Sequence, residues 1–169
     1  MKFGTIVLGL LLCALMVSGA MCQSTTSPTG NIQTPRVGYV PSGWYQTAND
    51  AYSPTMGYGL VEYTDNVDGD FVQIFYGPVP ASLQGQEGNS NALIAQAVSE
   101  AIFSPDDTGP MTVAGRLAGY AEAYDDYWMW WETEIVFVYG DTYVDIYTIY
   151  NASAPDIQDA TALIDSIYF

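Results

Sequence analysis

The alternation of apolar and polar positions is clearest between residues 134 and 150. This segment, EIVFVYGDTYVDIYTIY, consists of two runs rich in Val, Ile, Tyr, Phe and Thr that meet at Gly140 and Asp141. Such runs with such a junction predict an antiparallel β-hairpin. Its second strand has two faces, one with Val144, Ile146 and Thr148 and the other with Tyr143, Asp145 and Tyr147. We expect the strand to be half exposed to water, on the second of these faces.

Two earlier runs predict a second hairpin, over residues 59–65 and 70–77. Asp68-Gly69 lies at its tip, and both central residues of a type I′ turn take positive φ. The same segment resembles a calcium-binding loop. An EF-hand loop aligned on Gly69, however, requires an acid and a Glu at the positions where Thr64 and Phe75 stand. The sequence therefore favours a turn over a calcium site.

Further strands and loops follow from composition. A short strand is expected over residues 37–40, and one longer strand over residues 112–124, whose small residues allow another element to pack closely on it. Residues 45–57 and 78–88 are rich in Asn, Asp, Ser, Pro, Gly or Gln and are expected to be loops.

Two segments have the apolar spacing of helices. Residues 91–103 carry an apolar stripe made of Leu93, Ile94, Ala97, Val98, Ala101 and Ile102. A last helix is expected to start with Ser153 as its cap and to bury Ile157, Ala160, Ile164 and Ile167. Five to six strands with two main helices and short connections predict an α+β fold around a mainly antiparallel β-sheet.

The N-terminal segment, residues 1–21, has the pattern of an export signal. A positive start is followed by an apolar run of residues 5–17 and by small residues suited to cleavage. Cys22 is then the first residue of the mature chain, and we expect it to carry a lipid. The alternatives are cleavage after Ala20 with Cys22 free or paired to another chain, or an uncleaved membrane anchor. Residues 22–35 are polar and are expected to form a flexible tether to a domain of residues 36–169.

The balance of charge narrows the choice of partners. The sequence has 19 acidic and 3 basic residues, for a formal net charge of −16. Loss of the signal removes Lys2 and leaves Arg36 and Arg116. Because affinity for nucleic acids and anionic lipids comes chiefly from Lys and Arg, neither is an expected partner. Contact with a membrane is expected through the lipid anchor alone.

The residue types that are missing limit catalysis. The sequence has no His, and no Lys once the signal is removed, so the common Ser-His-Asp, Cys-His, Ser-Lys and Schiff-base systems are excluded. We therefore expect a non-enzymatic protein without a cofactor. The remaining catalytic alternative is a carboxylate pair of the glycosidase type, for which Glu132 and Glu134 share a strand face and Glu122 lies opposite. The simpler interpretation is a solvated strand face on which Arg116 offsets one carboxylate.

The most concentrated unusual group of side chains lies at residues 125–131. Aromatic rings beside acids suit a stacked sugar, a cation over a ring, or a basic partner protein. Alternation is expected to turn Trp131 and Met129 inward and Trp130 outward. The candidate ligand- or partner-binding residues are Asp125, Asp126, Trp128 and Trp130. The alternative is that these aromatics belong to the core and the strand edges.

Two smaller features complete the candidates. Asn151-Ala152-Ser153 is an acceptor sequence for glycosylation at Asn151, in competition with the capping role of Ser153. Paired Asp residues at 125–126 or at 68 and 70 offer oxygen atoms to a divalent cation, but such pairs are common in turns, and no metal site is assigned.

The order of elements resembles the PsbP/Mog1-like family. The resemblance covers residues 37–169 and rests on the segments PSGW, FVQIFYG, GRLAGYAEAY, TEIVFVYGDTYVDIYTIY and ALIDSIYF. It implies an antiparallel sheet flanked by helices. It also implies an extrinsic, often lipid-anchored, binding or assembly protein with a protein partner outside the membrane. The basic residues that contact partners in plant members have no counterpart here beyond Arg36 and Arg116, which argues against docking to a photosystem.

Overall fold

The computed structural model describes residues 30–169 except 66, 68 and 153. The predicted signal, Cys22 and the predicted cap Ser153 lie outside the described residues. The elements, in chain order, are β1 Arg36–Val37, β2 Trp44–Ser53, β3 Tyr58–Asp65, β4 Phe71–Pro78, α2 Ser90–Glu100, β5 Asp107–Val113, β6 Arg116–Asp125, β7 Trp130–Tyr139, β8 Thr142–Asn151, α3 Ala154–Asp165 and β9 Ile167–Tyr168.

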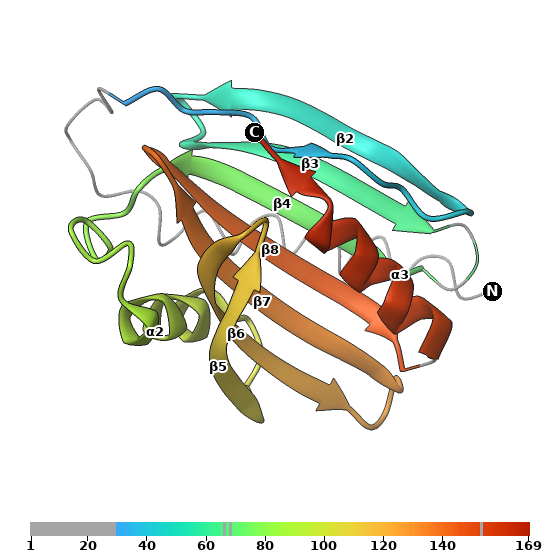
Figure 1. Ribbon diagram of the computed structural model, residues 1–169. Coiled ribbons are helices and arrows are strands. Elements are labelled where there is room, and N and C mark those ends of the chain that lie inside the picture. Colours follow the sequence, from blue (N-terminus) through green and yellow to red (C-terminus); the bar gives the residue numbers. More distant parts are fainter. Residues whose placement is uncertain (1–29, 66, 68, 153) are drawn as a thin grey trace.

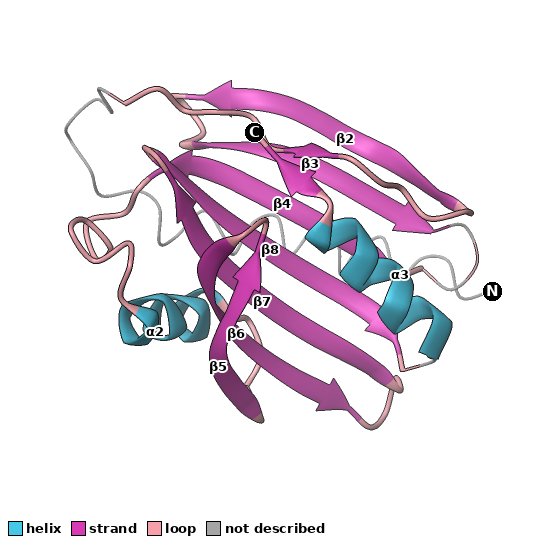
Figure 2. Ribbon diagram, viewed as in Figure 1, coloured by secondary structure: helices cyan, strands magenta, loops and turns pink. Residues whose placement is uncertain are grey.

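One antiparallel sheet dominates the fold. Its seven strands lie in the order β2-β3-β4-β8-β7-β6-β5, and β1 and β9 form a separate two-stranded sheet. Figure 1 shows α3 lying across the sheet, and Figure 2 shows that more of the chain forms strands than helices. The expected α+β class with a mainly antiparallel sheet and two helices is therefore confirmed, although the main sheet has more strands than expected.

The two helices cover opposite faces of the sheet. On one face, Leu163 and Ile164 of α3 join a core that includes Ile135, Phe137 and Ile146. On the other face, Leu93 and Ala97 of α2 pack with Val136 and Tyr143. Because alternate residues of β7 enter different cores, the sheet lies between the helices as the middle of three layers.

Strand β2 corrects the expectation of a loop over residues 45–57. It pairs with β3 through two irregularities, after Gln46 and after Asp50. Its side chains are mostly exposed, since β2 is an edge strand. Polar residues such as Asn49 and Asp50 are tolerated there, because the hydrogen bonds to β3 form whatever the side chains are.

The expected single strand over residues 112–124 is also wrong, because the chain turns back at Ala114 and Gly115. Both have positive φ, 52° and 73°, and they join β5 to β6 as a tight hairpin. The expected close packing on the small residues is nevertheless found. A Cβ at Gly119 would overlap the backbone of Leu93 and Ile94, so α2 lies directly against β6.

Strand β8 is buried on both faces, which contradicts the expectation that one face is exposed to water. Tyr143, Asp145 and Tyr147 are only 1%, 2% and 6% exposed. Glu100 at the end of α2 and Ile102 beyond it line a small cavity with Asp145 and Tyr147 and so cover this side of the strand. The central place of β8 in the sheet, which its own pattern does not reveal, accounts for the difference.

The remaining expectations hold with small changes. The hairpin of β7 and β8 turns at Gly140, and Gly69 has the expected positive φ of 83° between β3 and β4. Helix α2 ends at Glu100, earlier than residue 103, and Ile167 is buried in β9 and not in the last helix. Residues 31–34, from the segment expected to be a tether, lie against the sheet, where the Gln33 backbone donates to Thr142 Oγ1 at 2.8 Å.

Candidate binding site between α3 and the sheet

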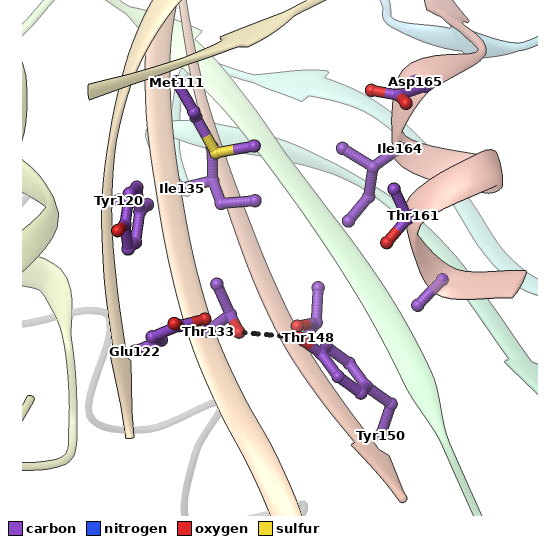
Figure 3. A pocket seen from close by; sticks show the side chains of 11 residues that line it. Met111, Tyr120, Glu122, Thr133, Ile135, Thr148, Tyr150, Thr161, Ile164 and Asp165 are labelled. Carbon is purple, nitrogen blue, oxygen red and sulfur yellow. Dashed lines mark hydrogen bonds between the residues drawn. The ribbon is translucent and has the colours of Figure 1, made fainter. Parts of the chain in front are cut away.

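A groove of about 240 Å³ lies between α3 and the strands β5–β8. The sheet contributes a floor and one wall, with Met111, Tyr120 and Ile135 among its apolar parts. Helix α3 contributes the facing wall through Ala160, Thr161, Ile164 and Asp165, which lie one turn apart in two pairs. Figure 3 shows Thr161, Ile164 and Asp165 of α3 facing the side chains of the sheet across the groove.

The groove exists because α3 does not cover the whole sheet. Its main contacts are with β8 and β4, so it covers the same face of β7 and β6 less closely. Strand register then decides which side chains form the floor. One row across neighbouring strands consists of Asp107, Glu122, Thr133 and Thr148. The next row consists of Gly109, Tyr120, Ile135 and Ile146, so one end of the floor is polar and the other is apolar.

The hydroxyl groups of the groove differ in their partners. Tyr120 OH donates to Asp107 Oδ2 at 2.9 Å, and Thr133 Oγ1 and Tyr150 OH lie 3.4 Å apart as a hydrogen-bonded pair (Figure 3). Thr148 is fully buried, and its Oγ1 has no partner among the described residues. A buried hydroxyl without a hydrogen bond is costly, so Thr148 is the least satisfied polar group of the floor.

The groove is lined by acidic side chains and by no basic one. Burial raises the pKa of Glu122, and the neighbouring Asp107 raises it further. Burial also raises the pKa of Tyr150, to which Glu122 adds, while the hydrogen bond from Thr133 lowers it. No Arg or Lys is among the lining residues, and Arg116 lies elsewhere, with its guanidinium carbon 4.7 Å from the centre of the Tyr139 ring.

The three glutamates singled out from the sequence do not form one site. Glu122 lies opposite Thr133 in the register, so it is on the α3 face, whereas Glu132 and Glu134 are on the α2 face. The expected solvated face is wrong for Glu134, which is 3% exposed. Glu132 is half-buried, and its Oε2 accepts from Tyr147 OH at 3.4 Å.

Glu134 instead forms a buried carboxyl pair with Asp145. The two carboxyl groups lie close enough for each to shift the pKa of the other. Burial raises the pKa of both, and the charge of Asp145 raises that of Glu134 further. The cavity that they line with Glu100 has a volume of only about 20 Å³, which is room for one water molecule. The pair is therefore closed to any larger substrate.

The aromatic loop, residues 125–130, is exposed and ordered by Asp125. The Asp125 Oδ1 accepts from the backbone of Tyr127 at 2.8 Å and of Trp128 at 2.9 Å, so this carboxylate shapes the loop. Asp126 is exposed. Trp128 stacks on Trp130, with ring centres 5.4 Å apart and planes 18° apart.

The exposure of the loop differs from the expectation at Met129 and at Trp130. Tyr127 and Trp128 are 83% and 59% exposed, and Met129, which was expected to turn inward, is 60% exposed. Trp130 and Trp131 are both half-buried. The Trp130 indole N–H is near enough to Glu132 to lower its pKa, but the two do not form a hydrogen bond of good geometry.

The other candidates are placed only in part. The Asn151 backbone donates to Asp70 Oδ1 at 2.9 Å at the end of β8, and the rest of its glycosylation sequence includes Ser153, outside the described residues. Among the described residues, no three acidic, His or Cys side chains are grouped so that they could hold a metal ion. Neither α2 nor α3, the helices of this part of the chain, has the length and apolarity needed to cross a bilayer.

No family model matches this chain, and no curated protein matches it significantly. The site must therefore be interpreted from its own residues. Among the lining residues, Glu122 is a candidate from the sequence, whereas Tyr120, Thr133, Thr148 and Tyr150 are not. The alternation within each strand contained the needed signal. Without the turn at Ala114 and the pairing of β7 with β6, however, it could not show that these residues share one face.

Proposed function

We propose that this protein is a non-enzymatic binding or assembly module that is exported and acts outside the membrane, and that the groove is its binding site. The observation that carries the proposal is the concave floor of the groove. There the Thr148 hydroxyl, which has no hydrogen-bond partner among the described residues, lies in a polar row beside an apolar one that contains Ile135. A few polar groups in a mainly apolar cleft are typical of binding sites.

The non-enzymatic character is supported by residue type and by geometry. The sequence has no His, and its only Lys is in the predicted signal. The buried carboxyl pair of Glu134 and Asp145 borders a cavity that holds no more than a water molecule. A glycosidase requires its two carboxyl groups on either side of a bound sugar, which a closed cavity does not admit.

The cellular part of the proposal is that the chain is PsbP/Mog1-like and is tethered through a lipid on Cys22. Its support is the signal-like N-terminus together with the three layers, in which a helix after β4 and a helix after β8 flank an antiparallel sheet. Mass spectrometry of the N-terminal peptide tests the tether. A diacylglycerol on Cys22 is the expected result, and an unmodified chain that starts at Met21 would contradict it.

Filling the groove tests whether it is the binding site. Thr161 is exposed and lines the groove from α3, so Thr161→Phe is expected to occupy the groove without disturbing the core. Thr112→Phe is the matched control, because Thr112 is exposed on β5 and does not line the groove. Bound components are captured from a membrane extract with the wild type and with each variant. We expect Thr161→Phe alone to lose them, and equal recovery by both variants would contradict the proposal.

The aromatic loop supports a second candidate function, the binding of a glycan or a cationic group. The observation in its favour is the exposed Trp128 ring stacked on Trp130, since stacked indoles bind sugars and cations through their faces. Quenching of Trp fluorescence by oligosaccharides, or by Ca²⁺, tests it. Quenching that Trp128→Ala removes supports this function, and the absence of quenching by either ligand argues against it.

A further inference from the structure

We propose that the groove selects a primary alkylammonium group, held with its ammonium above Thr133 and its alkyl chain along Ile135. This inference rests on the proposed function and adds the chemical class of the ligand. The same chemistry occurs in a small free amine and in a lysine side chain of a partner, and the experiment below distinguishes these two sources.

The charge of the groove favours a cation. Two carboxylates face it from opposite sides, Glu122 from β6 and Asp165 from α3 (Figure 3). Asp107 adjoins Glu122 in the same row of the sheet, and burial together with this neighbour raises the pKa of Glu122. A carboxylate that is desolvated beside a second acid gains from a nearby positive charge. An anionic ligand would add to the repulsion.

The polar row offers acceptors for the three N–H groups of an ammonium. Glu122, Thr133 and Thr148 oppose one another on three neighbouring strands, so their side chains are about 5 Å apart. An ammonium above Thr133 is then flanked by the Glu122 carboxylate and by Thr148 Oγ1, for which the described part of the chain provides no partner. Thr133 Oγ1 can accept as well, because a hydroxyl oxygen has two lone pairs.

The other end of the groove suits a short apolar chain. Ile135 follows Thr133 by two residues on the same face of β7, and Met111 and Ile164 also line the groove. Its volume of about 240 Å³ lies below the roughly 300–1,000 Å³ of pockets for drug-sized ligands. A chain of a few carbons with one charged end therefore matches both the size and the polarity of the site.

The proposal is tested by titrating the mature protein, as isolated from cells, with n-butylammonium. Binding is followed by methyl-detected NMR. Butanol and butyrate are the neutral and anionic counterparts with the same number of carbons. We expect n-butylammonium to shift the methyl signals of Met111, Ile135 and Ile164 saturably. Butanol should bind at least about tenfold more weakly, because it lacks a charged hydrogen bond, and butyrate should not bind.

Two variants separate recognition from folding. Glu122→Gln is expected to weaken n-butylammonium binding about tenfold or more. Thr148→Val is expected to weaken binding several-fold and yet to raise the unfolding temperature, because it removes a buried hydroxyl that no described residue hydrogen-bonds. A merely structural role of Thr148 would change stability without changing affinity. Asp50→Asn is the control and should change neither, because Asp50 is exposed on the edge strand β2 and does not line the groove.

The outcomes distinguish a free amine from a lysine side chain of a partner. They also separate a failure of alkylammonium selection from a failure of the groove as the binding site. If N-acetyl-lysine methylamide binds as well as n-butylammonium, the groove accepts a lysine side chain of a partner; if it is excluded, the groove takes free amines. Either result supports alkylammonium selection. Equal affinity for butanol, or no shift with n-butylammonium, overturns the inference. The proposed function would still stand if Thr161→Phe abolished capture of the bound components.

Discussion

At the scale of single residues, the most consequential feature outside the groove is the buried pair of Glu134 and Asp145. Both side chains are almost inaccessible to water, at 3% and 2% exposed. Two carboxyl groups in contact cannot both ionise without a large cost, so the folded protein holds a proton that the unfolded chain releases. The pair is thus a local destabilising element at neutral pH.

The pH dependence of stability is predicted from this pair. Burial raises the pKa of Glu134 well above its usual value, and that of Asp145 to about 6. The folded state therefore binds more protons than the unfolded state at any pH between the ordinary values near 4 and the raised ones. The free energy of unfolding should then fall as the pH rises from about 4 through 6 and beyond, which urea denaturation at a series of pH values measures.

Glu134→Gln should flatten this decline and raise stability at pH 7 by on the order of 1 kcal/mol for each unit of the lost shift. The reason is that the amide donates to Asp145 at any pH without releasing a proton. Asp126→Asn, an exposed change in the aromatic loop, serves as the control. A wild-type profile that rises between pH 4 and 7, or a variant profile parallel to it, would contradict the account of the pair.

At the scale of elements, the turn between β5 and β6 is strained at one position. Ala114 has a φ of 52°, a conformation that costs an L-residue about 1–2 kcal/mol, whereas Gly115 adopts its φ of 73° without a steric penalty. Ala114→Gly should therefore stabilise the protein by up to about 1 kcal/mol, after the greater loss of backbone entropy. Thermal unfolding measures the change. Ala51→Gly, in the exposed edge strand β2, should instead destabilise the protein. A change of the same sign in both variants would show that Ala114 is not strained.

The contact of α2 with β6 depends on Gly119, which has no room for a side chain. A Cβ there would overlap backbone atoms of Leu93 and Ile94, and a helix backbone cannot move aside cheaply. Gly119→Ala should destabilise the protein by about 1–3 kcal/mol, as overpacking does. Gly88→Ala is the control, because nothing lies near its Cβ position. Similar denaturation midpoints for the two variants would show that α2 is held less tightly than its packing indicates.

The elements also show how far sequence reasoning reaches. The hairpins around Gly69 and Gly140 were predicted correctly, because Gly with Asp between two β-rich runs is a local signal. The turn at Ala114-Gly115 was missed, since Ala rarely takes positive φ and gives no such signal. Strand β2 was missed because its stability comes from pairing with β3, a tertiary contact that its polar sequence does not record.

At the scale of the whole molecule, the groove results from how three layers fit together. Helix α3 is placed over β4 and β8, and strands β5 and β6 extend the sheet beyond it, so part of one face stays open. The sequence predicted the class of fold and named the acidic candidates. Alternation within one strand, however, shows only which residues of that strand share a face. Which acids share a face follows only from strand order and register. For that reason Glu122, which was expected opposite Glu132 and Glu134, lies on the other face of the sheet from both.

The central claim, that this open part of the sheet is the binding site, is tested most directly by an unbiased ligand screen with methyl-detected NMR. The library should contain cationic, neutral and anionic fragments together with oligosaccharides. The account predicts that bound fragments shift the methyl signals of Met111, Ile135 and Ile164 and leave those of the exposed Met56 and Ile102 unchanged. Fragments that act only on the aromatic loop, or a library in which none shifts the three groove methyls, would contradict it.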